Sequence, residues 1–196
     1  MAGKTGKIRQ VVLLKTMACF GDSLVQGFPY DKDTSWVAQV ERRTGIKMLN
    51  YGICGDCCDD IYDRLSNGYL PESVSYIVFL GGANDILQGR PQEHILNDFV
   101  KLIKWCRQQH LQLCIVLPLL TNEAALNVRL ERLRETIRQR FTDTCIIDLQ
   151  PAIGFTSAHR AQSYLDGVHP LAKTYTALGD YAAVLLQQWS TENSRI

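Results

Sequence analysis

The segment SYIVFLGGAND, residues 75–85, joins an apolar run to a glycine-rich polar turn. A run of five or six Val, Ile, Leu and aromatic residues that ends at glycine is typical of a strand rather than a helix. The segment therefore predicts a strand over Ser75–Leu80, followed at once by a loop that carries Asn84 and Asp85.

Four further apolar runs have a similar length and similar Gly, Pro, Asn or Asp boundaries. They are Thr16–Phe20, Lys47–Tyr51, Gln112–Leu117 and Thr144–Leu149. Longer amphipathic stretches separate the runs, and a regular strand–helix alternation implies parallel strands joined by right-handed crossovers. The sequence thus predicts the α/β class, with a three-layer α/β/α sandwich around a five-stranded parallel sheet.

The stretches between the strands have helical periodicity. Apolar residues recur at spacings of four, three and four residues from Ile95 to Cys106, and similar stripes run from Leu126 to Phe141 and from Leu171 to Leu185. Such spacing places each apolar set on one face of a helix, where it can pack against the sheet. Asp33 and Thr34 are the candidate caps of a further helix.

The composition is that of a globular protein. The chain has 196 residues, of which 46% are hydrophobic and 21% charged, and these values exclude a disordered or collagen-like chain. The net charge of +1 argues against nucleic acid or an acidic membrane as the main partner. No apolar run approaches the roughly 20 residues of a membrane span. We expect an N-terminal extension over residues 1–15, a single domain over 16–190 and a tail over 191–196.

The cysteines and the N-terminus bear on the compartment. An odd total of seven cysteines, scattered along the chain, favours free thiols in a reducing environment. The apolar run Val11–Leu14 is shorter than the roughly 7–15 residues of a secretory signal core. These features predict a cytoplasmic protein.

Polar and glycine residues follow the predicted strands. Ser23 comes after the first strand, Gly55 lies in the turn after the second, and Asn84 follows the third. Asp166 and His169 precede the last helix. In parallel sheets, sites form beyond the carboxyl ends of the strands. We therefore expect these side chains to meet at one edge of the sheet.

Four short sequence blocks contain these residues, and their order along the chain resembles that of the SGNH hydrolases, also called the GDSL esterase/lipase family. CFGDSLVQG at residues 19–27 is similar to the family's nucleophile block, and NYGICGDC at 50–57 is similar to its second block. GGAND at 81–85 matches the family's Gly-x-Asn-Asp, and DGVHP at 166–170 matches its Asp-x-x-His-Pro. The resemblance covers the chain from about Thr16 to about Leu186, and it implies the flavodoxin-like strand order 2-1-3-4-5.

The resemblance also implies a role for each of these residues. Ser23 would be the nucleophile, His169 the general base and Asp166 the carboxylate that orients the imidazole. Gly55, Asn84 and the backbone N–H of Ser23 would form the oxyanion hole.

The chemistry of acyl transfer needs these residue types. A serine hydroxyl becomes a good nucleophile only when a base removes its proton, and a carboxylate on the second imidazole nitrogen fixes the required tautomer. The negative charge that develops on the carbonyl oxygen needs fixed hydrogen-bond donors, and the loss of one donor typically costs about 10²–10³ in rate. This reaction requires neither a metal nor an organic cofactor, so we expect none.

Some of these residues have simpler interpretations. Ser23 and Asp166 could be helix caps, and Gly52 is a rival to Gly55 as the oxyanion glycine. Asp22 and Asp85 are interpreted as carboxylates that fix the loops around the site, in a second layer behind the reacting groups, and not as acid–base groups.

The cysteines of Cys54-Gly-Asp-Cys57-Cys58 stand where the family usually has hydroxyl residues. A C-x-x-C pair can be a redox pair or half of a zinc site, but a zinc site needs a second pair, and the other cysteines are isolated. Small residues packed beside the oxyanion turn explain them better. Oxidation of Cys54 or Cys57 that distorts this turn remains a hypothesis.

The sequence thus predicts a serine esterase that cleaves carboxylic esters, or thioesters, of short or medium acyl groups. The alternatives are a carbohydrate O-acetyl esterase, an inactive binding module of the same fold and a thiol redox protein. The expected partner is a small-molecule ester. We expect apolar side chains in the loops after the strands to line the substrate pocket. They are Phe28, Tyr30, Leu87, Leu119 and Leu120.

Overall fold

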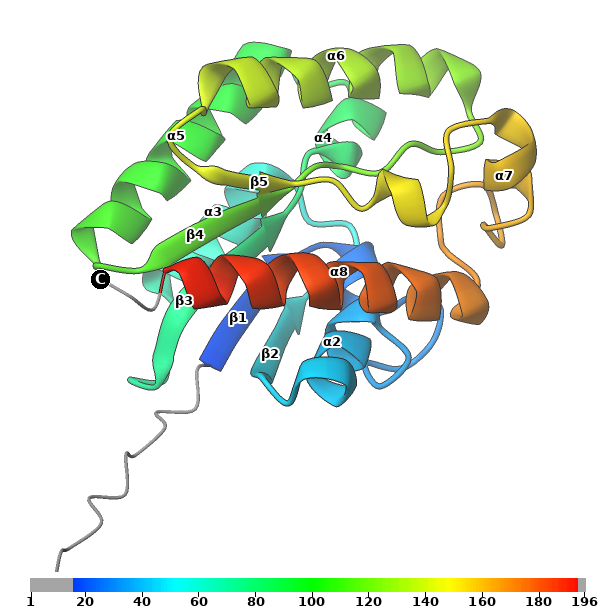
Figure 1. The fold of residues 1–196 in the computed structure, drawn as a ribbon. Coiled ribbons are helices and arrows are strands. Elements are labelled where there is room, and N and C mark those ends of the chain that lie inside the picture. Colours follow the sequence, from blue (N-terminus) through cyan, green and yellow to red (C-terminus); the bar gives the residue numbers. More distant parts are fainter. Residues whose placement is uncertain (1–15, 194–196) are drawn as a thin grey trace, which may run out of the picture.

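The computed structural model describes residues 16–193 as a five-stranded parallel sheet between two layers of helices (Figure 1). The strands lie in the order β2-β1-β3-β4-β5, which confirms the predicted fold class and strand order. Their bounds are β1 Thr16–Gly21, β2 Lys47–Gly52, β3 Val74–Leu80, β4 Gln112–Val116 and β5 Cys145–Ile147. The last strand is shorter than predicted.

The helices connect successive strands and are drawn along the sheet in Figure 1. Their bounds are α1 Ser23–Gln26, α2 Trp36–Thr44, α3 Cys58–Asn67, α4 Ala83–Leu87, α5 Gln92–Gln108, α6 Ala124–Arg140, α7 Ser157–Ala161 and α8 Ala172–Glu192. A short 3-10 turn, η1, spans Gln150–Ala152. Within residues 16–193, no helix is both long enough and apolar enough to cross a membrane.

Side chains alternate between two cores because successive residues of a strand point to opposite faces of the sheet. On β3, Tyr76, Val78 and Leu80 pack with the helices α2 and α8. Ile77 and Phe79 point the other way, into the core formed with α3, α5 and α6. A parallel sheet covered on both faces needs apolar residues at every position, which is why this strand is a continuous apolar run.

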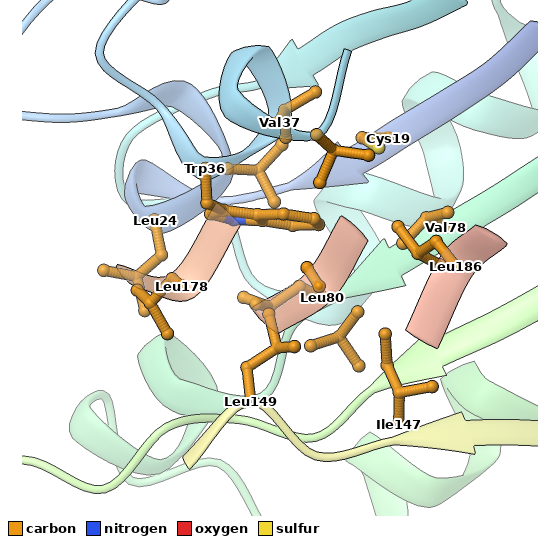
Figure 2. Packing of buried hydrophobic residues seen from close by; sticks show 14 of the residues in the cluster. Cys19, Leu24, Trp36, Val37, Val78, Leu80, Ile147, Leu149, Leu178 and Leu186 are labelled. Carbon is orange, nitrogen blue, oxygen red and sulfur yellow. The ribbon is translucent and has the colours of Figure 1, made fainter. Parts of the chain in front are cut away.

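Trp36 is a large buried side chain at the start of α2. Its indole lies among Val37, Leu80 and Leu178 and is 1% exposed (Figure 2). Burial of a side chain of this size stabilises the fold by more than about 2 kcal/mol. This packing ties α2 to α8, the helix that follows the loop bearing His169.

The structure corrects one local prediction and leaves the domain limits as predictions. The cap of α2 is Ser35, whose hydroxyl accepts the Val37 N–H, rather than Asp33 or Thr34. Asp31 instead binds the Thr34 N–H within the preceding turn. Helix α8 continues to Glu192, and the predicted extension 1–15 and the residues 194–196 of the predicted tail lie outside the described residues.

Candidate active site

Ser23 opens the short helix α1 directly after β1. The side chain of the preceding residue, Asp22, caps this helix by accepting the Leu24 N–H at 2.9 Å. Ser23 is therefore the first helical residue and not the cap, which excludes the simpler interpretation of its role. Its side chain lies at the carboxyl edge of β1, the strand between β2 and β3.

The loop that carries Asp166 and His169 is stabilised by its own hydrogen bonds. Asp166 Oδ1 accepts the backbone N–H groups of Val168 and His169 at 3.0 and 2.8 Å. The Gly167 carbonyl accepts the Asn122 N–H at 2.8 Å, which joins this loop to the segment after β4. Asp166 is not the cap of α8, since that position belongs to Leu171.

Ser23, His169 and Asp166 form a continuous hydrogen-bonded chain. His169 Nε2 lies 3.1 Å from Ser23 Oγ, and His169 Nδ1 lies 2.7 Å from Asp166 Oδ2. Both distances are within hydrogen-bond range. The ring can therefore accept a proton from the serine on one side while it donates to a carboxylate on the other.

Asp166 is strongly biased towards its charged form. Partial burial raises the pKa of Asp166, but hydrogen bonds from the His169 ring and from two backbone N–H groups outweigh it and lower the pKa to about 2. The carboxylate is thus ionised throughout the neutral range, as the orientation of a neutral imidazole requires.

Phe28 contacts the imidazole from the side. Its ring centroid lies 4.7 Å from that of His169, with an interplanar angle of 66°. The Tyr175 hydroxyl donates to the Phe28 carbonyl at 2.8 Å and so anchors this residue on α8. Phe28 keeps 39% of its surface exposed, so it can also contact a bound substrate.

The turn Ile53–Cys58 links β2 to α3 and contains Gly55. Five of its six backbone N–H groups have acceptors, among them the Gln26 side chain for Cys54 and the Asp85 side chain for Cys58. Within residues 16–193, the N–H of Gly55 is the one donor of this turn without an acceptor. Gly55 is exposed, so this N–H is open to water or to a bound ligand.

Gly55 and Gly52 differ in backbone conformation, in the space around them and in whether the N–H has an acceptor. Gly55 has a φ of +85°, a conformation that favours glycine, and no atom lies within 4 Å of the place where a Cβ would stand. Gly52 donates its N–H to Asn50 Oδ1 at 3.0 Å, and its Cβ would lie 2.1 Å from the Gln26 nitrogen. Gly52 therefore serves the close approach of β2 to α1, which leaves Gly55 as the better oxyanion candidate.

Asn84, the second residue of α4, faces the same turn. Its Nδ2 donates to the Asp56 carbonyl at 2.9 Å. An amide nitrogen carries two hydrogens, so one N–H remains for another acceptor. The contact holds Asn84 one residue away from Gly55, and this brings together two of the residues that the sequence analysis assigned to an oxyanion hole.

Asp22 and Asp85, which the sequence analysis interpreted as carboxylates that fix the loops, are both buried. Burial raises the pKa of Asp22 to about 7, although the Leu24 N–H opposes this. Asp85 accepts the Cys58 N–H at 3.0 Å and pairs with Arg90. Burial also raises the pKa of Asp85, while the hydrogen bonds from Arg90 and Cys58 oppose the increase.

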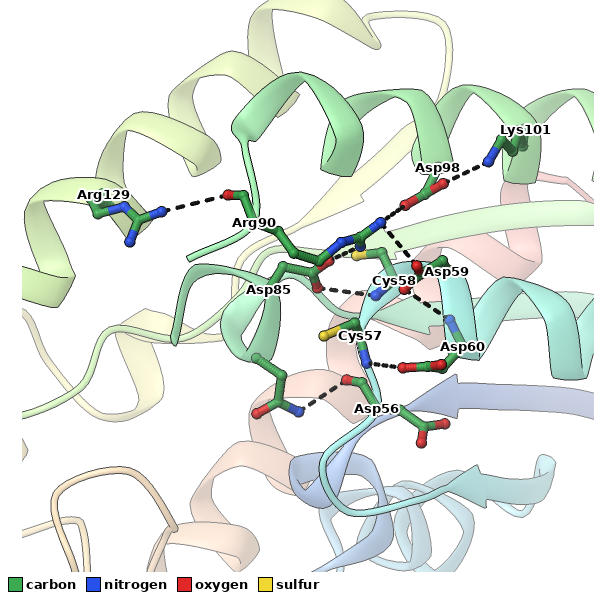
Figure 3. Close-up of polar contacts among 11 residues, drawn as sticks. Asp56, Cys57, Cys58, Asp59, Asp60, Asp85, Arg90, Asp98, Lys101 and Arg129 are labelled. Atoms are coloured by element: carbon green, nitrogen blue, oxygen red, sulfur yellow. Dashed lines mark hydrogen bonds and ion pairs between the residues drawn. The ribbon is translucent and has the colours of Figure 1, made fainter. Parts of the chain in front are cut away.

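Two arginines contact this region, and the sequence analysis missed both. Arg64, on α3, donates to Asp56 Oδ2 at 2.7 Å and to the carbonyls of Tyr51 and Gly21 at 2.9 and 3.2 Å. It therefore binds the ends of β2 and β1 together with the turn. Arg90, between α4 and α5, joins several carboxylates (Figure 3). Neither residue lies in a recognisable motif, so only their partners in space reveal them.

One group near the site has the composition of a metal site. Ligand atoms of Cys57, Asp59 and Asp85 lie within 4.8 Å of one another. However, Arg90 pairs with both carboxylates, and burial raises the pKa of Cys57 to about 12. A guanidinium between the carboxylates and a protonated thiol do not suit a divalent cation, which binds thiolate and free carboxylate.

Two of the predicted pocket residues are in the core instead. Leu119 and Leu120 are 3% and 2% exposed and pack on opposite faces of the sheet. Tyr30 packs against the core beside Tyr175. Phe28 and Leu87, which were also predicted to line the pocket, are exposed. Ile53 and Leu165, which were not predicted, are exposed as well.

Comparison with known proteins shows the family of the chain. The family described as GDSL-like lipase/acylhydrolase matches residues 19–177, a span that includes both Ser23 and His169. The chain belongs to this family. The resemblance inferred from the four sequence blocks is thereby confirmed, and with it the expectation of a GDSL-family hydrolase. A search of curated proteins found no match to this GDSL-family chain.

Solved structures with this fold are numerous. A lipase/acylhydrolase from Enterococcus faecalis aligns with a TM-score of 0.74 and 19% identity over 89% of this chain and 96% of that one. The psychrotrophic esterase EstA from a Pseudoalteromonas species, inhibited by monoethylphosphonate, gives 0.74 and 17% over 90% and 99%. A carbohydrate acetylesterase family member from Sinorhizobium meliloti gives 0.66 and 17% over 89% and 98%. At these identities the likeness establishes the fold of this GDSL-family chain.

Proposed function

We propose that the protein is a serine esterase in which Ser23 is the nucleophile, His169 the general base and Asp166 the orienting carboxylate. The observation that carries this proposal is the hydrogen-bonded chain from Ser23 Oγ through His169 to Asp166, with distances of 3.1 and 2.7 Å. A serine that bonds to one imidazole nitrogen, while a carboxylate bonds to the other, is in the arrangement that activates a serine nucleophile.

The reaction proceeds in two steps. Ser23 Oγ attacks the ester carbonyl while His169 Nε2 takes its proton, and the imidazolium then protonates the leaving alcohol as the ester bond breaks. Water attacks the acyl-enzyme, and His169 again accepts and returns the proton, which releases the acid and restores Ser23. Asp166 stabilises the imidazolium that forms in each step.

Three donors are available for the oxyanion. The N–H of Gly55 has no acceptor within the described residues, and Asn84 keeps one N–H beyond its bond to Asp56. The backbone N–H of Ser23 is the third donor that we assign. Together they would stabilise the charge that develops on the carbonyl oxygen, and this is usually the largest single contribution to the rate.

The surroundings of the site favour an apolar acyl group of short or medium length. Phe28, Ile53 and Leu87 are 39%, 46% and 49% exposed, and Leu165, next to Asp166, is 59% exposed. These apolar side chains would contact an acyl chain, and the burial of apolar surface would stabilise the bound substrate. Thioesters fit the same chemistry, because the attacking group and the oxyanion are unchanged.

A carbohydrate O-acetyl esterase is the second candidate. The Sinorhizobium meliloti neighbour is a carbohydrate acetylesterase family member, but its identity of 17% carries the fold alone. A panel of acetylated sugars, aryl esters and acyl thioesters of increasing chain length separates these activities. The exposed apolar residues predict that kcat/KM is higher for aryl and short acyl esters than for sugar acetates.

The first test needs no choice of substrate. Wild type and His169→Ala are incubated with an alkyl fluorophosphonate, and the added mass is located by peptide mass spectrometry. We expect label on Ser23 in the wild type and little label in the variant. Absence of label on Ser23 in the folded wild type contradicts the proposal and favours an inactive binding module.

We further propose that the protein acts in the cytoplasm. All seven cysteines are free thiols, although the sulfur atoms of Cys114 and Cys145 lie 3.5 Å apart on adjacent strands. Two thiols this close would tend to form a disulfide in an oxidising compartment. Cell fractionation with an immunoblot tests the assignment, and recovery in a secreted or periplasmic fraction contradicts it.

A further inference from the structure

We propose that Arg90 is a positioning residue for the oxyanion donors, acting through Asp85 on the turn Ile53–Cys58. The inference rests on the proposed function, because it concerns the geometry of the same site. Arg90 touches neither Ser23 nor His169, and no sequence motif includes it. Its assignment comes from the contacts of one guanidinium with three carboxylates on three different elements.

The turn is bound at two points by two adjacent residues of α4. Asn84 Nδ2 donates to the Asp56 carbonyl at 2.9 Å, and Asp85 Oδ2 accepts the Cys58 N–H at 3.0 Å. These contacts lie one and three residues beyond Gly55. A shift of α4 relative to α3 would therefore displace both the Gly55 N–H and the Asn84 amide, which are the two oxyanion donors outside α1.

Arg90 connects α4 to its neighbours (Figure 3). Its Nη1 binds Asp85 Oδ1, and its Nη2 lies 3.0 Å from Asp98 on α5 and 3.0 Å from Asp59 on α3. The backbone N–H of Arg90 donates to the backbone carbonyl of Asp85 at 2.8 Å. One planar side chain thus joins α3, α4 and α5, a geometry that a lysine ammonium cannot reproduce.

The charge of Arg90 matters because Asp85 is completely buried. The Asp85 side chain is 0% exposed and the Arg90 side chain 21%. A buried carboxylate without a partner is strongly destabilised, and a group in that position takes up a proton instead. Arg90 therefore allows Asp85 to accept the Cys58 N–H as a carboxylate, and a charged acceptor makes a shorter and roughly twice stronger hydrogen bond.

Catalysis is more sensitive than folding to the precision of this arrangement. A displacement of about 1 Å in a catalytic group can cost about 10²-fold in rate. Because the oxyanion forms only as the carbonyl is attacked, misplaced donors lower kcat and leave ground-state binding almost unchanged. This signature separates a positioning role from a contribution to stability alone.

The experiment compares Arg90→Lys and Arg90→Met with the loss of a second, more exposed arginine–carboxylate pair elsewhere. Arg43 makes a similar two-pronged contact with Asp180, at 2.5 and 3.0 Å, between α2 and α8. Arg43→Met thus removes an arginine–carboxylate pair that joins two helices but does not reach the turn. For each variant, kcat and KM are measured on a short-chain aryl ester, together with Tm and deuterium exchange of the peptide that covers residues 53–58.

We expect Arg90→Met to lower kcat by about 10²-fold with KM within about twofold. Arg90→Lys should recover part of this loss, since it keeps the charge near Asp85. Exchange over the turn should be faster in Arg90→Met than in Arg43→Met. If Arg90→Met does not fold, Asp85→Asn with Arg90→Gln replaces it, because removal of both charges leaves no buried unpaired ion. This double variant should show the same loss in kcat.

Unchanged kcat in a folded Arg90→Met or in the double variant overturns the inference. So does an equal loss of kcat in Arg43→Met, which would mean that any lost ion pair lowers the rate. Failure of the proposed function looks different, because the wild type would then neither hydrolyse the ester nor react at Ser23. In that case the exchange comparison still decides whether Arg90 holds the turn, and equal exchange in the Arg90 and Arg43 variants overturns the inference.

Discussion

The Nε2 atom of His169 lies 3.1 Å from Oγ of Ser23, although 146 positions separate the two residues in the chain. They meet because β1 lies between β2 and β3 and because α8, which follows the histidine loop, packs on α2. Ser23 and His169 therefore approach the same sheet edge from opposite ends of the sequence.

Asp166→Asn should lower kcat by about 10⁴-fold, because an amide at this position favours the wrong tautomer of His169. Its Oδ1 can still accept the N–H groups of Val168 and His169, so the loop should persist. Steady-state kinetics and Tm measure the two effects. A loss below tenfold in kcat would show that His169 does not depend on this carboxylate.

Gly55→Ala and Gly45→Ala form a matched pair. Both glycines have positive φ values, +85° and +71°, and in both cases the place of a Cβ is empty. Each substitution should cost about 1–2 kcal/mol of backbone strain. Gly45 lies before β2 and the turn lies after it, at the opposite end of the strand, so only Gly55→Ala should lower kcat, by about tenfold or more. Equal kcat values in the two variants would argue against Gly55 as an oxyanion donor.

Asn84→Ala should lower kcat by about 10²–10³-fold with little change in KM. Asn127→Ala is the control, because Asn127 is buried and its Nδ2 also donates to a backbone carbonyl, that of Thr121, at 2.7 Å. Asn84→Ala loses one hydrogen bond, whereas Asn127→Ala loses the three that Asn127 makes with Thr121, so the control should lose at least as much stability. Only Asn84→Ala loses a proposed oxyanion donor. The prediction is wrong if the two variants have the same kcat.

Asp22→Asn should make the protein more stable at pH 8 and leave its stability near pH 4 unchanged. Burial raises the pKa of Asp22 from 3.8 to about 7, so the wild type loses stability as the pH rises from about 4 through 7. The expected gain at pH 8 is on the order of 4 kcal/mol. Asparagine keeps the acceptor for the Leu24 N–H and is as good a cap as aspartate. Urea unfolding at both pH values measures this difference, and parallel stability curves for the two proteins would exclude it.

Hydrogen peroxide should leave the esterase activity unchanged. Burial raises the pKa of Cys57 to about 12, and burial with nearby Asp22 and Asp56 raises that of Cys54. Since the thiolate is the reactive form, both thiols should oxidise slowly. Activity and thiol mass are followed together after peroxide treatment. Loss of activity in the wild type that Cys54→Ser prevents would restore the redox hypothesis for this turn.

The strands and the positions of the site residues were predictable because both depend on local sequence. Five apolar runs bounded by turn residues define the strands, and the residue after each run must lie at the carboxyl edge of a parallel sheet. Ser23 and Asn84 could therefore be assigned to one edge before any coordinates were known. His169 follows no strand directly, and it was assigned there from the DGVHP block before the last helix. The strand order came from the resemblance to the family, since spacing alone does not decide which strands are neighbours.

The cap of α2 and the pocket residues were predicted less well. Ser35 caps the helix because its hydroxyl also donates to the Val25 carbonyl, a contact between segments ten residues apart. Leu119 and Leu120 follow β4 and belong to a loop in sequence, but they are buried because both faces of the sheet are covered there. Local pattern does not reveal how far each core extends beyond the strand ends.

The sequence by itself determined the fold class and the edge of the sheet at which the candidate site groups gather. Only the tertiary structure decided which charged residues hold those groups in place. Arg64 and Arg90 bind carbonyls and carboxylates on several different elements, and no spacing along the chain encodes such contacts. The physical reason is that apolar periodicity is repeated many times along a strand or helix, whereas an ion pair depends on one side chain reaching one partner after the layers have packed.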